Sequence, residues 1–222
     1  MHEADVSTTR TDPTLGLRSR WTRAFLLGEL VGFIPPAVVG TTLGSAGASD
    51  AAMVTGLTLA GSLEGAAIGY AQSRVLARYV PALDGRAWIR ATAVAAAFAW
   101  FVGMSGPALF SAEVLPVGLV LAIMIPAWTC GLLAMGYLQW RVLRTCIPGS
   151  ARWVPVTAGA WLIGVMIPVA ALSVVPNGSA PWVMVTVAII AAVAMGVAVG
   201  ALTGGTLAGL VRRDVRAGTL TT

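Results

Sequence analysis

Apolar residues along the chain gather into six long runs that are separated by short polar segments. Each run reaches about 20 residues, the length at which an α-helix crosses the roughly 30 Å hydrocarbon core of a bilayer. A backbone in lipid must satisfy its own hydrogen bonds, so helices are the expected structure. The predicted helices cover residues 22–44, 51–73, 88–110, 116–140, 153–175 and 182–210. The pattern predicts an all-α integral membrane protein with six transmembrane helices.

Composition supports this class, because 57% of the 222 residues are hydrophobic and only 10% are charged. A soluble domain carries about 25% charged residues, so ordinary soluble enzymes and nucleic-acid readers are excluded. The net charge of +5 comes from arginines between the apolar runs, and we therefore expect no nucleic-acid partner. Cys130 and Cys146 are too few and too badly placed for a disulfide framework, and both are expected to be free thiols.

Arginines occur on one side only of the predicted membrane. The segments 45–50, 111–115 and 176–181 contain none, whereas all 14 lie in the tails and alternate loops or at the helix ends beside them. By the positive-inside rule, both termini are expected in the cytoplasm. A cleaved signal peptide ending near Ala46 is the alternative for the first run, but that run is longer than the usual 7–15 residues and contains Glu29.

An eight-residue motif recurs at the ends of the even-numbered helices. Residues 69–76 and 136–143 share Gly-Tyr-x-Gln-x-Arg-Val-Leu at an offset of 67, with six identities in eight positions. A weaker third copy, at 200–207, keeps the Gly and Leu. The odd-numbered helices open with their own marker, a tryptophan at positions 21, 88 and 153.

The repeat is therefore a helical hairpin, and each hairpin leaves and returns to the same side. The sequence predicts three parallel helical-hairpin repeats around an axis near the membrane normal, forming a pseudo-threefold bundle. The expected divisions are a cytoplasmic tail at 1–20, hairpins at 21–87, 88–152 and 153–211, and a second cytoplasmic tail at 212–222.

The motif has a functional and a structural interpretation. In the first, Gln72 and Gln139 form a polar ring at the cytoplasmic mouth of a central cavity, with Tyr70 and Tyr137 as further ligand-binding candidates. The second is favoured, because Tyr and Trp belong at membrane interfaces and a Gln near a helix end can bond the backbone of a neighbour. Interfacial anchoring is likewise expected for Trp21, Trp88, Trp153 and Trp182.

The Gln-x-x-Val-Leu ending resembles that of many small bacterial membrane proteins, which implies a bacterial cytoplasmic (inner) membrane and no particular activity. Metal and cofactor chemistry lack the residues they need. The only histidine is His2, no Cys-x-x-Cys occurs, and no lysine is available for a phosphate-binding loop or a Schiff base. We therefore expect no metal and no cofactor.

Glu29 and Glu64 are the two carboxylates inside the apolar runs. Such a group costs about 2.5 kcal/mol or more at the membrane centre on insertion scales, which indicates function. Both lie roughly 12–15 Å from the inner interface, so they are expected to share one polar pocket and to keep at least one proton. Their expected role is proton handling or general-acid catalysis, and the alternative is a hydrogen-bonded structural Glu. The other acids, Asp214 among them, are expected to be solvated.

Binding or transport of a small molecule or ion through a cavity is the favoured function. One alternative is a metal-independent membrane enzyme that uses a protonated Glu on a lipid or isoprenoid substrate, so enzymatic activity stays open. Another is an accessory subunit of a larger membrane complex. Membrane lipids are the expected surroundings, and glycine stripes at 28–40, 61–69 and 196–204 could pack helices or join a homo- or hetero-oligomer. Helix kinks or unwinding are expected at Pro35, Pro36, Pro126 and Pro168.

Overall fold

The computed structural model describes residues 14, 16–113, 115–176 and 178–218. These ranges contain helices and no strand. The helices are α1 (Leu17–Gly32), α2 (Ile34–Ser45), α3 (Asp50–Tyr79), α4 (Gly85–Ser111), α5 (Val117–Leu143), the 3₁₀ turn η1 (Ser150–Arg152), α6 (Trp153–Ser173) and α7 (Pro181–Arg216). With α1 and α2 taken together, six segments are long and apolar enough to cross a membrane. The prediction of six long apolar helices is confirmed.

Prolines interrupt the first span but not the others. A break at Phe33 separates α1 from α2, and Pro35 and Pro36 follow it directly. Because proline has no N–H, the carbonyls of Val31 and Gly32 lack their helical donors. By contrast, α5 and α6 continue through their internal prolines. The predicted unwinding therefore occurs only at the paired prolines.

Two helices extend into the predicted polar tails. The first begins at Leu17 and the last continues to Arg216, several residues beyond the apolar runs. The expectation that Asp214 is solvated is wrong, because it lies within α7 and is 7% exposed. Hydrophobicity marks the part of a helix that lipid can cover, whereas the helix itself ends where its hydrogen bonds end.

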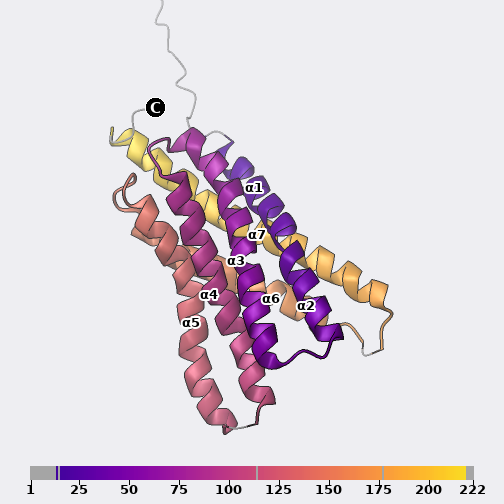
Figure 1. Ribbon diagram of the computed structural model, residues 1–222. Helices are drawn as coiled ribbons and strands as arrows, with labels where there is room; N and C mark the ends of the chain where they lie inside the picture. Colours follow the sequence, from indigo (N-terminus) through magenta and orange to yellow (C-terminus); the bar gives the residue numbers. More distant parts are fainter. Residues whose placement is uncertain (1–13, 15, 114, 177, 219–222) are drawn as a thin grey trace, which may run out of the picture.

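The six spans pack in a closed order. Each contacts the next along the chain, and α7 returns to pack against α1 (Figure 1). Glycines make several of these contacts close, because a Cβ on Gly28 would lie 2.8 Å from the Cα of Ile68 in α3. Gly65 and Gly69 face α4 in the same way, and Gly200 faces α1. The stripes thus let helices of the same chain approach each other.

The buried core lies at the end of the bundle where α1 begins and α7 ends, which is called the terminal end. Its main cluster joins side chains of every span, including Leu17, Leu76, Trp88, Leu143, Trp153 and Leu207. Toward the opposite end the hairpins diverge (Figure 1), and residues 181–190 of α7 include no buried one. One end is therefore held by packing within the chain, while the other presents mostly apolar side chains outward.

Candidate functional site

Three tryptophans meet at the centre of the terminal end. Trp21, Trp88 and Trp153 are fully buried. Their ring centroids lie 6.1 Å apart for Trp21 and Trp88, 5.9 Å for Trp21 and Trp153, and 6.0 Å for Trp88 and Trp153. The interpretation of these three as interfacial anchors is wrong. Trp182 differs, since 71% of it is exposed at the start of α7.

Each buried indole donates its N–H to a polar side chain on another span. Trp88 Nε1 donates to Gln72 Oε1 at 3.0 Å. Trp153 Nε1 donates to Gln139 Oε1 at 3.1 Å, and Trp21 Nε1 donates to Thr203 Oγ1 at 2.9 Å. Buried indoles usually need such a partner. Sequence reasoning missed Thr203, although it stands where the third motif copy replaces the Gln.

Gln72 and Gln139 are also joined to each other. The Gln139 amide nitrogen lies 3.4 Å from Gln72 Oε1 and 3.1 Å from the Thr92 hydroxyl, to which it also donates. Both glutamines are buried in this side-chain network. The favoured interpretation, in which each Gln bonds the backbone of a neighbouring helix, is therefore wrong. Tyr70 and Tyr137 are exposed, so the structure brings the glutamines together and leaves the tyrosines apart from them.

An apolar layer lies next to this network. Phe25, Ile68, Ala160 and Val199 form a buried cluster, against which Trp161 packs. Phe25 comes four residues after the α1 tryptophan, and Ile68 comes four residues before the α3 glutamine. The layer therefore lies about one helical turn further from the start of α1 than the tryptophan network does.

Beyond the layer lie the two carboxyl groups, which contact each other. Glu29 is 1% exposed and Glu64 is 5% exposed. The two side chains are close enough for their charges to interact. Trp100 Nε1 donates to Glu64 Oε2 at 2.6 Å, while Glu29 Oε2 is buried without a hydrogen-bond partner among the described residues. Burial and like charge both disfavour ionisation of two neighbouring carboxyl groups at once, so the pair is able to hold and release a proton.

Glycines explain why the two helices bring these groups together. A Cβ on Gly32 would lie 2.9 Å from both the Cα and the carbonyl oxygen of Glu64, so only glycine permits this approach of α1 to α3. On the other side of α3, a methyl group on Gly61 would overlap the indole of Trp100. Trp100 was missed by the sequence argument. Its position in the middle of a span, away from the interfaces, was the available signal.

No further acid or cysteine among the described residues joins Glu29 and Glu64 to form a metal-binding group. The part of the chain that the structure describes has no group of three His, Cys, Asp or Glu side chains able to hold a metal ion. Asp50, Asp84 and Glu113 are exposed, and Asp84 caps α4 by accepting from two backbone N–H groups. The candidate site is therefore two carboxyl groups with one indole donor.

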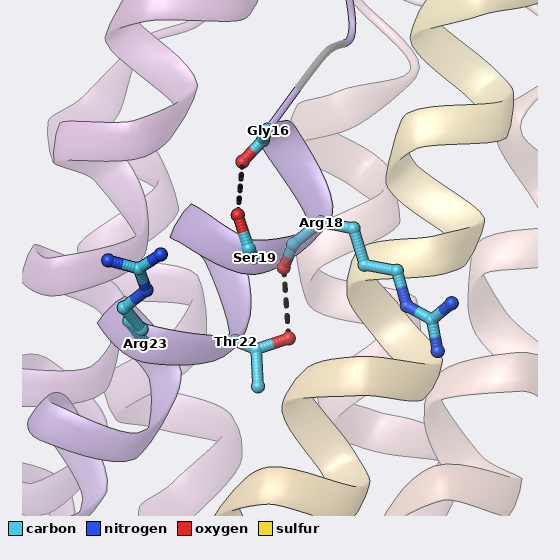
Figure 2. A pocket seen from close by; sticks show the side chains of 5 residues that line it. All are labelled: Gly16, Arg18, Ser19, Thr22 and Arg23. Atoms are coloured by element: carbon cyan, nitrogen blue, oxygen red, sulfur yellow. Dashed lines mark hydrogen bonds between the residues drawn. The ribbon is translucent and has the colours of Figure 1, made fainter.

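A shallow hollow of about 500 Å³ occurs on the first turns of α1 (Figure 2). Its hydroxyl groups are already bonded within the helix, because Ser19 donates to the Gly16 carbonyl at 3.0 Å and Thr22 donates to the Arg18 carbonyl at 2.9 Å. The Arg18 and Arg23 side chains extend in opposite directions (Figure 2). The hollow itself offers little chemistry for recognising a ligand.

Comparison with protein families, with characterised proteins and with solved structures finds no match to this chain.

Proposed function

We propose that the chain is a multi-pass membrane protein that binds or transports a small molecule or ion at the Glu29–Glu64 pair, with the shared proton as the exchanged species. The observation that carries this proposal is the unpartnered Glu29 Oε2 beside the buried carboxyl group of Glu64. An ionisable pair at this depth is costly, and its free acceptor can bind a cation or a donor once the proton leaves.

The proposed architecture is three hairpins around an approximate threefold axis. Support comes from the cyclic order of the indole bonds, in which each hairpin's second helix accepts from the first helix of the next hairpin. The acids break this symmetry, because the positions equivalent to Glu29 are Ala96 and Trp161 and the second-repeat equivalent of Glu64 is Gly131. A site in one repeat suits binding or proton handling better than a purely architectural role.

The proposed setting is the inner membrane of a bacterium, with both termini in the cytoplasm and lipids around the exposed apolar faces. The one-sided distribution of arginines supports this orientation. In that orientation the apolar layer around Phe25 and Ile68 lies between the pair and the cytoplasmic end of the bundle. The glycine stripes contact helices of the same chain, which favours a role within the chain over one in an oligomer.

The test is cation-induced proton release from the purified protein in lipid nanodiscs. A pH dye in weakly buffered solution would follow additions of Na⁺, K⁺, Mg²⁺ and a series of small organic amines. We expect at least one probe to release a proton from the wild type, and we expect Glu29→Gln, Glu64→Gln and the double variant to abolish that release. Glutamine keeps the size and shape of the side chain and removes its ionisation.

Glu113→Gln is the matched control, because Glu113 is an exposed acid between α4 and α5. It should release the proton as the wild type does. The proposal is wrong if no probe releases a proton from the wild type, or if both single variants respond as fully as the control.

A further inference from the structure

A second groove, of about 420 Å³, lies on the outside of α7 near the terminal end. Arg18 of α1 and Arg152 of η1 line it from either side, and Gly205, Gly209 and Leu202 of α7 form part of its floor. Nothing proposed above assigns a role to this groove, and the inference does not depend on the carboxyl pair.

The two guanidinium groups lie over the same face of α7. A Cβ on Gly205 would come within 3.9 Å of Arg18 Nε, and one on Gly209 would come within 3.0 Å of Arg152 Nη2. The two glycines are one helical turn apart, about 6 Å along the axis. Figure 2 shows the Arg18 side chain extending from α1 toward the yellow part of α7. A side chain at Gly209 would crowd the Arg152 guanidinium group, and a Cβ at Gly205 would be in ordinary contact with Arg18.

Positive charge in the groove is not compensated by hydrogen bonds within the described chain. Arg152 Nε is buried and has no hydrogen-bond partner among the residues that the structure describes. Arg213 adds a further positive charge near Arg152. Asp214 lies about 140° around α7 from Gly209, away from the groove face. The arrangement matches an anion that two arginines can hold.

The groove also has an apolar part. Leu202 lies seven residues before Gly209, about 10 Å further from the terminal end of the bundle, and Val156 of α6 lines the same groove. The Leu202 side chain is exposed on the outer surface of the bundle. A ligand here would meet two guanidinium groups at one end and apolar side chains toward the membrane interior, which is the order of groups in a phospholipid.

We propose that this groove binds an anionic phospholipid of the leaflet on the terminal side, with its phosphate between Arg18 and Arg152 and an acyl chain along Val156 and Leu202. Basic pockets between membrane helices on the cytoplasmic side bind acidic head groups by this chemistry. The apolar end of the groove distinguishes a lipid from a free phosphate ion.

Native mass spectrometry of the detergent-purified protein, with phosphatidylglycerol or phosphatidylcholine added, tests the proposal. We expect phosphatidylglycerol to bind more tightly than phosphatidylcholine. Arg152→Gln and Arg18→Gln should each weaken phosphatidylglycerol binding about fivefold, the effect of one arginine near an anionic surface. Arg18 is exposed, so its variant tests the site without a buried change. Arg90→Gln, at an exposed arginine of α4, is the control and should bind as the wild type does.

Competition separates the two sources of phosphate. Inorganic phosphate or glycerol phosphate should not displace the bound lipid at concentrations equal to that of phosphatidylglycerol. Displacement by either would overturn the lipid assignment. Equal binding of phosphatidylglycerol to the wild type and to both arginine variants, or equal binding of the two lipids, would overturn the site itself.

Discussion

A tryptophan at the start of a membrane helix has two possible environments, and the same sequence pattern fits both. Trp182 faces outward, whereas Trp88 is buried against Gln72 on the neighbouring span. The difference is whether an adjacent helix carries a hydrogen-bond acceptor level with the indole N–H, as Gln72 is for Trp88. Where the N–H finds such a partner, the large indole can be buried without a penalty for its polar atom.

Trp88→Phe should destabilise the protein by about 1–3 kcal/mol, because it leaves the Gln72 carbonyl without its indole donor and removes ring contacts. The change should appear as a lower midpoint of thermal unfolding in detergent, followed by circular dichroism. Trp182→Phe is the matched control at an exposed site and should leave the midpoint unchanged. Equal midpoints for the two variants would show that the buried network adds no stability.

At the scale of elements, the spacing between helices is set by positions without a Cβ. The carboxyl pair exists because α1 and α3 approach closely at Gly32, and the Trp100 donor reaches Glu64 because Gly61 leaves room for its ring. The pair is thus a product of helix packing as much as of the two acidic residues.

Gly32→Ala should separate α1 from α3 and cost about 1–3 kcal/mol, because the new methyl group meets backbone atoms that cannot rotate away. Gly44→Ala is the control, since a Cβ there would meet nothing within 4 Å. It should be neutral or slightly stabilising through helix propensity. Thermal unfolding of both variants measures the difference, and similar midpoints would contradict the close packing of these helices.

The sequence predicted the six spans and the matched depth of Glu29 and Glu64, because hydrophobic length and position along a helix are local properties. The break at Phe33 was also predictable, since Pro35 and Pro36 remove two backbone donors. The end of α7 could not be predicted from hydrophobicity, because charged residues can continue a helix beyond its apolar part. The roles of Gln72 and Trp100 depend on which helix lies opposite, and no local pattern reports that.

At the scale of the whole molecule, the decisive contact is between the first and last spans. Without the packing of α7 on α1, the hairpins would form an open row, and the Trp21–Thr203 bond could not exist. Closure of the ring places residues far apart in sequence within reach of each other.

A disulfide can test that closure. A Cβ on Gly196 would lie 3.8 Å from the Cβ of Leu26, within the usual range for a cystine. Leu26→Cys with Gly196→Cys, in a background without the native cysteines, should cross-link on oxidation. After cleavage at a protease site inserted at Gly149, the two fragments should stay joined on a non-reducing gel. Leu27→Cys with Gly196→Cys, whose first position is exposed, should not link.

Orientation can be measured with single cysteines in the same background. Ala46→Cys, Ala112→Cys and Ala180→Cys lie in exposed turns at the end opposite the termini, and Ala82→Cys lies in an exposed turn at the terminal end. The first three should react with an impermeant thiol reagent outside intact cells, because the arginine-free loops are expected there. Labelling only at position 82 would reverse the proposed topology.

The tryptophan triad also gives the protein a built-in optical reporter. Three indoles whose centroids lie about 6 Å apart at large mutual angles form an asymmetric, rigid chromophore cluster, and near-ultraviolet circular dichroism is sensitive to such fixed aromatic packing. Any motion that spreads α1, α4 and α6 at the terminal end would weaken this signal while leaving the helical signal intact. Opening of the bundle on that side could therefore be followed without attaching a label.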